Sequence, residues 1–132
     1  MIEVEVLGAR LAPGAPPAAE IERLCVRAAA SRGVDDGHVA VEFVDAPRMQ
    51  ALNREHRGKA APTDVLSFPI DGAGPQRSAP RELGDVVVCA EHTADLREAI
   101  VHGMLHLLGM DHERDHGEML ALQAELLAGA GA

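Results

Sequence analysis

Residues 102–112 read His-Gly-Met-Leu-His-Leu-Leu-Gly-Met-Asp-His, and this stretch decides how the second half of the chain folds. Its apolar residues predict a helix that ends where Gly109 can adopt the left-handed conformation of a helix C-terminus. His102 and His106 then lie one turn apart on one face of that helix, so their rings can bind the same metal ion. The reversal at Gly109 lets His112 return to the same point. Three neutral imidazoles with one open position are typical of a catalytic zinc site.

The spacing of these residues matches the extended zincin pattern, in which His, His, Gly and His occupy the first, fifth, eighth and eleventh positions. In zincins a glutamate follows the first histidine and acts as the general base of peptide hydrolysis, whereas this chain has Gly103 there. We therefore predict a hydrolytic site that binds one zinc ion through His102, His106 and His112 and lacks the base of a peptidase.

Other interpretations of the histidines stay open. Without a metal they would be ordinary residues of an amphipathic helix, although three rings converging in apolar surroundings would be costly without a partner. His116 lies four residues after His112 and is a candidate fourth ligand, although a solvated position at the start of the last helix suits it better. Asp111 and Glu113 are candidate acceptors for an imidazole N–H, or else form an acidic turn that faces solvent.

The rest of the chain predicts an α+β fold. Apolar alternation or continuous apolar runs predict strands over residues 2–6, 38–44, 65–70 and 86–89. Helical spacing predicts a helix ending before Gly33, one between its N-cap Asp45 and Gly58, one that Thr93 caps, and one over 115–127 with Met119, Leu122 and Leu126 inward. The order β-α-β-α-β-β-α-α gives one four-stranded mixed sheet packed with helices. The metal site then lies on a helix of the C-terminal half and on the turn that follows it.

Length and composition limit the class of protein. At 132 residues we expect a single domain spanning residues 1–132. Apolar residues make up 47%, which argues against intrinsic disorder, and Phe43 and Phe68 are too few aromatic residues for a base-stacking platform. No apolar run is long enough to span a bilayer, the first residues are acidic, and Cys25 and Cys89 are expected to be reduced core thiols. A cytoplasmic location without a membrane partner fits these features.

The charge is uneven along the chain. The net charge of −9 excludes a protein that coats nucleic acid by bulk electrostatics. Residues 48–59 nevertheless carry Arg48, Arg54, Arg57 and Lys59 against one anion, a net charge of +3. Guanidinium groups suit phosphate contacts, although a solvated helix face has the same pattern. We therefore expect any grip on RNA to be local and to rest on phosphate and metal contacts.

The sequence resembles a known family, the YbeY metallo-endoribonucleases. Four segments carry this resemblance, and their order along the chain agrees with the family: Leu-Asn-Arg-Glu-His-Arg-Gly-Lys at 52–59, Pro-Thr-Asp-Val-Leu-Ser-Phe-Pro at 62–69, Leu-Gly-Asp-Val-Val-Val at 83–88, and the three-histidine segment at 102–112. The similarity covers roughly residues 38–127. The second and fourth segments together are highly specific.

The resemblance implies more than the spacing does. It implies zinc at His102, His106 and His112, and a functional arginine at Arg57, so that Arg57 and His102 are the expected catalytic residues. It also implies a single-strand-specific endoribonuclease that acts in 16S rRNA 3′-end maturation and late ribosome quality control. The implied partners are an rRNA precursor and the ribosome or a small-subunit protein. Water and the RNA 2′-OH both stay open as the nucleophile.

The chain departs from the family pattern at two places. Met110 stands where the family usually has Tyr, and the segment between the strand at 86–88 and His102 is shorter than usual. Both departures bear on substrate range more than on metal binding. The alternatives are a ribosome-assembly or RNA-binding factor with a structural zinc site, a zinc peptidase, and a helical interaction module with incidental histidines.

Overall fold

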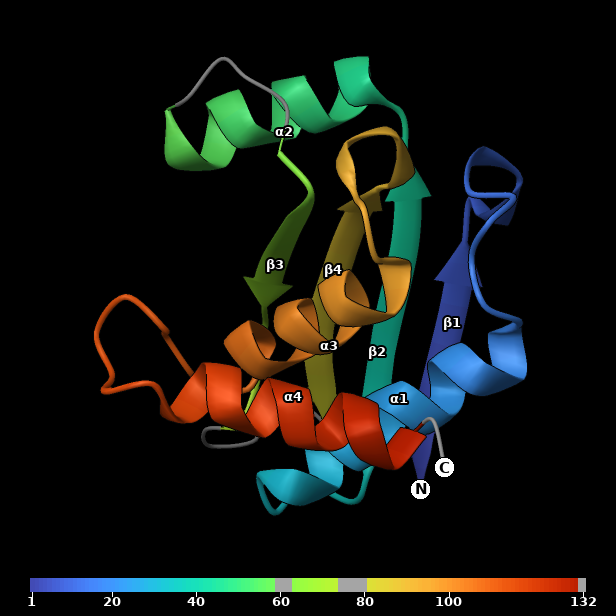
Figure 1. Cartoon of the computed structure of the whole chain (residues 1–132). Coiled ribbons are helices and arrows are strands. Elements are labelled where there is room, and N and C mark those ends of the chain that lie inside the picture. The colour runs from blue at the N-terminus through green and yellow to red at the C-terminus, as the bar shows by residue number, and fades with distance from the viewer. Residues whose placement is uncertain (59–62, 74–80, 131–132) are drawn as a thin grey trace.

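A computed structural model describes residues 1–58, 63–73 and 81–130 of the chain (Figure 1). The helices and strands are β1 (Ile2–Leu7), α1 (Ala18–Ser31), β2 (Gly37–Val44), α2 (Ala46–Arg57), β3 (Val65–Pro69), β4 (Glu82–Cys89), α3 (Leu96–Leu107) and α4 (Glu118–Ala130). Two short 3-10 turns, η1 (Ala9–Leu11) and η2 (Ala90–His92), follow β1 and β4. The predicted order of elements is confirmed. None of the helices described is long and apolar enough to cross a membrane.

The four strands form one mixed sheet in the order β1-β2-β4-β3. β1 and β4 both run parallel to β2, and β3 runs antiparallel to β4. Figure 1 shows α3 and α4 crossing one face of this sheet, with α1 beside them. The predicted α+β class, with a single mixed sheet, is therefore confirmed.

The main core lies between the sheet and these three helices. Alternate residues of β2 and β4 point into it because successive strand residues face opposite sides, and Phe43 is only 1% exposed. Apart from this one ring the main core is built from aliphatic and sulfur-containing side chains. Cys25 and Cys89 are both buried free thiols, and burial raises the pKa of Cys25 to about 12.

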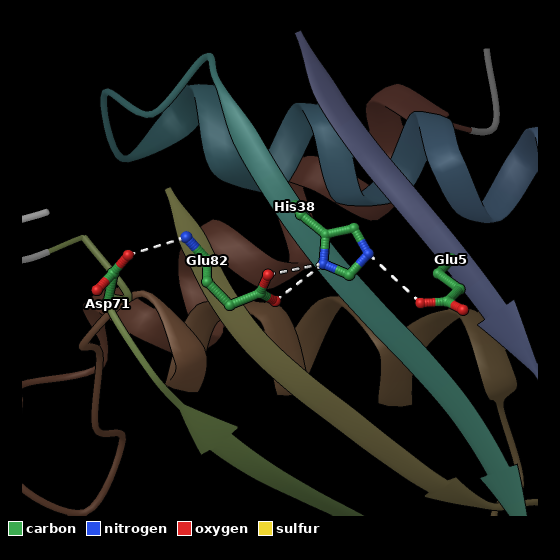
Figure 2. A network of polar contacts seen from close by, with 4 residues as sticks. All are labelled: Glu5, His38, Asp71 and Glu82. Atoms are coloured by element: carbon green, nitrogen blue, oxygen red, sulfur yellow. Dashed lines mark hydrogen bonds and ion pairs between the residues drawn. The ribbon is translucent and has the colours of Figure 1, made fainter. Parts of the chain in front are cut away.

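The opposite face of the sheet divides into two parts. Beneath α2 it is apolar, and a second small core forms there from Val44, Met49, Leu52, Leu66, Val87 and Cys89. Away from α2 the strands carry polar side chains, among which Figure 2 shows His38 between two carboxylates. Its Nδ1 lies 2.9 and 3.0 Å from the two carboxylate oxygens of Glu82, and its Nε2 lies 3.4 Å from Oε1 of Glu5.

Two predicted helix starts are wrong. Thr93 does not cap α3, because its hydroxyl donates to the carbonyl of Cys89 (2.6 Å), and the carboxylate of Asp95 accepts the backbone N–H of Glu98 instead. The last helix begins at Glu118, three residues later than predicted. Gly117 has a positive φ of 99°, which ends the preceding turn, and Asp115 only accepts N–H bonds from Gly117 and Met119. The predicted cap Asp45 is confirmed, since it accepts the N–H of Arg48.

Candidate metal centre

A glycine brings α3 close to the sheet. A Cβ atom at Gly103 would lie 2.5 Å from Cγ1 of Val86 and 3.0 Å from Cγ2 of Val65, so a larger residue does not fit without displacing strand side chains. The hydroxyl of Ser67 also donates to the carbonyl of Gly103 (2.7 Å). The position that carries the zincin glutamate is therefore packed against the strands, and a carboxylate base cannot stand there.

The turn after α3 reverses the chain as predicted. Gly109 has a positive φ of 96°, its N–H donates to the carbonyl of His106, and the N–H of Met110 donates to the carbonyl of Leu105. These bonds close the helix end and direct the following residues back over the last turn of α3. His112 reaches its position through this reversal.

The structure brings the three predicted ligands together. His102 and His106 of α3 and His112 of the turn each offer one nitrogen, and the three nitrogens all lie within 4.8 Å of one another. The ring centroids are 4.7, 5.0 and 5.3 Å apart. This group could hold a metal ion through three imidazoles.

Hydrogen bonds determine which ring nitrogens are free to bind. Nδ1 of His102 lies 2.7 Å from Oε1 of Gln123, and Nδ1 of His106 lies 3.0 Å from the carbonyl oxygen of Met110. Both oxygens can only accept, so both Nδ1 atoms carry the hydrogen and both Nε2 atoms keep a lone pair. These Nε2 atoms face each other at 3.1 Å. Nδ1 of His112 is buried and without a hydrogen-bond partner. Converging lone pairs of this kind fit a divalent cation.

The electrostatics of α3 favour the form of the ligand that binds metal. Burial lowers the pKa of His106 below its usual value, and the neighbouring His102 lowers it further, while the hydrogen bond to Met110 opposes these effects. A neutral imidazole is therefore preferred, and only the neutral ring can donate a lone pair to a metal.

The three histidines open onto a cavity of about 980 Å³. One wall of the cavity is formed by β3 and the two residues before it, and another by the turn after α3. Besides the three histidines, the residues that line the cavity are His56, Thr63, Asp64, Val65, Leu66, Ser67, Phe68, Pro69, Gly109, Met110, Asp111 and Glu113. The group of histidines that could hold a metal ion is thus next to a space that a substrate can enter.

The other candidate residues are placed as follows. Arg57 is the last residue of α2, but its side chain lies outside the described part of the structure, as does Lys59. His116 is exposed before α4, and it is not in the histidine group found among the described residues. Asp111 faces the cavity, while its Oδ1 accepts the N–H of Glu113 and so shapes the turn.

Two features of the site were not predicted from the sequence. Gln123 supports His102 from α4, and its only sequence signal is a polar residue on the apolar face formed by Met119 and Leu126. His56 packs against Phe68 with ring centroids 4.3 Å apart, and both line the cavity. Neither contact joins residues that are close in sequence, so no local spacing predicts it.

Comparisons with known proteins identify the family. The model of the family described as "Endoribonuclease YbeY" matches residues 17–131. A relative of that name from Geobacillus kaustophilus is 41% identical, over 84% of this chain and 85% of its own length, and one from Azorhizobium caulinodans is 41% identical, over 88% and 84%. The solution structure of a Thermotoga maritima protein has a similar fold, with a TM-score of 0.57 at 24% identity, over 96% of this chain and 88% of that one. The chain therefore belongs to the YbeY endoribonuclease family.

Proposed function

We propose that this chain is a zinc-dependent endoribonuclease that cuts single-stranded RNA. The observation that carries the proposal is the convergence of three imidazole nitrogens beside a cavity, in a chain whose relatives are named endoribonucleases. A zinc ion held there would act as a Lewis acid toward a phosphoryl oxygen and would make a water molecule a better nucleophile at neutral pH.

The chain's own residues hold the metal and compensate charge. His102, His106 and His112 are the proposed zinc ligands. Three acidic residues, Asp64, Asp111 and Glu113, are among those that line the cavity, and their charge repels a phosphodiester. A cation is needed to offset them as charge develops on the phosphate. We assign this role to Arg57, which directly follows His56 at the end of α2.

The proposed preference for single strands rests on the two rings at the cavity wall. His56 and Phe68 meet at 4.3 Å with their planes 59° apart. A nucleobase can stack on a protein ring only when it is not stacked within a duplex. This contact adds one stacking position to a site that otherwise holds phosphate, and a paired strand cannot use it.

The family resemblance and the charge of the chain support a proposal for the biological substrate. We propose that it is the 3′ end of the 16S rRNA precursor in the cytoplasm, during ribosome maturation and quality control. A protein of net charge −9 has weak intrinsic affinity for RNA. Targeting by a ribosomal protein partner therefore belongs to the same proposal.

Two alternatives are less consistent with the site. A structural zinc site is normally closed by a fourth protein ligand, and His116, the candidate for that place, is exposed outside the histidine group. A zinc peptidase of the zincin type needs the glutamate that Gly103 replaces. The packing of Gly103 against Val86 leaves no room for it.

The direct test compares cleavage of a single-stranded RNA with that of the same sequence in a duplex, with zinc content measured for each protein. His106→Ala should contain no stoichiometric zinc and should not cleave. Arg57→Glu should keep its zinc and lose about 100-fold in cleavage rate, the usual cost of removing a group that stabilises transition-state charge. Arg23→Glu makes the same charge change at an exposed position of α1 and should cleave normally.

Two results would contradict the proposal. Cleavage at the wild-type rate by metal-free His106→Ala would exclude the histidine group as the active site. Equal cleavage of the duplex and the single strand would exclude the role given to the ring pair. The products identify the nucleophile, because attack by the RNA 2′-OH leaves a 2′,3′-cyclic phosphate and attack by water does not.

A further inference from the structure

Gln123 occupies an unusual position for an amide. It lies on α4 between Met119 and Leu126, on the face that packs into the core, and it is only 8% exposed. Few polar side chains are this buried in the part of the chain that the structure describes. An amide buried without a hydrogen bond destabilises a protein, so its partner accounts for its presence. That partner is His102, whose Nδ1 lies 2.7 Å from Oε1 of Gln123.

The contact determines the chemical form of His102. A neutral imidazole has two tautomers, and only the one with hydrogen on Nδ1 leaves Nε2 free to bind a metal. Oε1 of Gln123 accepts that hydrogen and also fixes the rotation of the ring. The freed Nε2 atom of His102 points toward Nε2 of His106 at 3.1 Å, where the metal position is expected.

We propose that Gln123 is a positioning residue of the metal centre. It holds His102 in its metal-binding tautomer, and it thereby couples the docking of α4 to metal binding. The inference rests on the proposed metal site but on no step of RNA cleavage. Gln123 acts through His102 and is not itself a ligand.

A comparison with the other two histidines shows why Gln123 is the side chain that can position a ligand. His106 has the carbonyl of Met110 as its acceptor, which no side-chain substitution removes, and Nδ1 of His112 has no partner. Among the described residues, Gln123 is therefore the side chain through which the orientation of a ligand can be changed. It is also a neutral acceptor, so a carboxylate in its place would draw the Nδ1 hydrogen more strongly and make Nε2 a better donor.

The first experiment measures zinc affinity of the whole chain by competition with a chromophoric chelator. Gln123→Leu should weaken zinc binding by about 10- to 100-fold, the usual effect of removing an acceptor behind a metal-binding histidine. Gln123→Glu should bind zinc at least as tightly as the wild type. Leu126→Ala is the matched control, because it removes buried packing from the same face of α4 but no hydrogen-bond acceptor, and it should leave the zinc affinity within about threefold.

The second experiment reads the tautomer directly in the metal-free protein. Long-range ¹H–¹⁵N NMR of the His102 ring should show hydrogen on Nδ1 in the wild type and in Gln123→Glu, and a mixture of tautomers in Gln123→Leu. A packing role alone would not change this signature. If Gln123→Leu is too unstable to purify, the affinity and tautomer of Gln123→Glu still decide the matter, because weaker zinc binding there contradicts the proposal.

The remaining outcomes separate this inference from the proposed function. An unchanged tautomer and zinc affinity in Gln123→Leu would overturn the inference, as would an equal loss of affinity in Leu126→Ala. If zinc-loaded wild-type protein fails to cleave RNA, the proposed function is wrong. The role of Gln123 then still stands or falls on the binding and NMR results.

Discussion

Three histidines of this chain, His38, His102 and His106, sit in two contrasting environments. His38 lies on a polar part of the sheet between Glu82 and Glu5, whereas His102 and His106 lie on an apolar helix and are hydrogen-bonded to an amide and a main-chain carbonyl. Both environments contain acceptors for an imidazole N–H. The sheet acceptors carry negative charge, and those of the helix are neutral.

This difference decides what each ring can do. The hydrogen bond to Glu82 raises the pKa of His38, and the charges of Glu82 and Glu5 raise it further. Burial and the neighbouring rings lower the pKa of His106. His38 is therefore favoured as a cation that holds β1 and β4 to β2, and His106 as a neutral ligand. A count of histidines in the sequence does not distinguish these two roles.

The largest expected effect comes from removing one histidine from each environment and comparing how the two variants bind zinc. His102→Ala should lose stoichiometric zinc, and its thermal midpoint should no longer rise when zinc is added, because a ligand stabilises only the state that binds it. His38→Ala should retain one zinc per chain and the full zinc-induced rise. Elemental analysis and thermal unfolding with and without zinc measure both. If His102→Ala retains its zinc, the two histidine environments do not differ in metal binding.

The next effect concerns the contact of α3 with the sheet. Gly103→Ala should destabilise the fold by about 1–3 kcal/mol, because its Cβ would meet Val86 at 2.5 Å and Val65 at 3.0 Å. Gly14→Ala is the control, since nothing lies within 4 Å of a Cβ atom there. Urea unfolding gives both free energies. Equal stability of Gly103→Ala and the wild type would show that α3 is less tightly packed than described.

A smaller effect is expected at the cavity wall. Phe68→Leu keeps an apolar side chain but removes the ring that packs against His56. The KM for a single-stranded RNA should rise about fivefold, the lower end of the range for a base–aromatic contact, with zinc content unchanged. An exposed leucine away from the cavity, Leu120→Ala, should leave KM unchanged. If kcat falls and KM does not, Phe68 affects the metal site and not base binding.

The smallest effect is the pH dependence of stability due to His38. Its pKa is raised in the folded state by Glu82 and Glu5, and Asp85 adds a further carboxylate nearby. The stabilisation by the charged ring is thus complete below its unfolded pKa of about 6.5, and it is lost as pH rises through the folded value. Because the groups are partly exposed, we expect less than about 1 kcal/mol.

The measurement compares urea unfolding of the wild type and His38→Gln between pH 5.5 and 8.5. The wild type should be the more stable at the acid end, and the difference should shrink toward the alkaline end. His92→Gln, at an exposed position in η2, is the control and should show no such trend. A difference that grows with pH would mean that His38 is bound as a neutral ring.

Local signals predicted most of the fold. Alternation in β1 and β2, the Asp45 cap of α2 and the glycine after α3 are each contained within a few neighbouring residues, and each prediction agrees with the structure. The predicted helix starts at Thr93 and Asp115 are wrong because both side chains bond to the backbone of the turn before the helix. The Thr93 hydroxyl donates to the carbonyl of Cys89, and Asp115 accepts the N–H of Gly117 as well as that of Met119 in the first turn of α4. Hydrogen bonding in a folded turn overrides the general preference for a cap.

Only the part of the site formed by residues close together in the sequence could be predicted. Spacing on one helix brings His102 and His106 together, and one glycine returns His112 to them. Gln123 and the pair of His56 and Phe68 arise where α4 meets α3 and where α2 meets β3. Such contacts depend on how elements dock, and a single sequence carries no direct signal for docking.

Met110 contributes to the site in two ways, as a hydrogen-bond acceptor and as part of the cavity wall. Its carbonyl oxygen lies 3.0 Å from Nδ1 of His106 and orients that ring, and the residue also lines the cavity. Every amino acid supplies the same carbonyl, so this position can change its side chain while the metal ligand keeps its acceptor. A substitution of Met110 would therefore keep the acceptor of His106 while it changed a residue of the cavity lining. The cavity can thus be altered at this one position without disturbing the orientation of the histidine beside it.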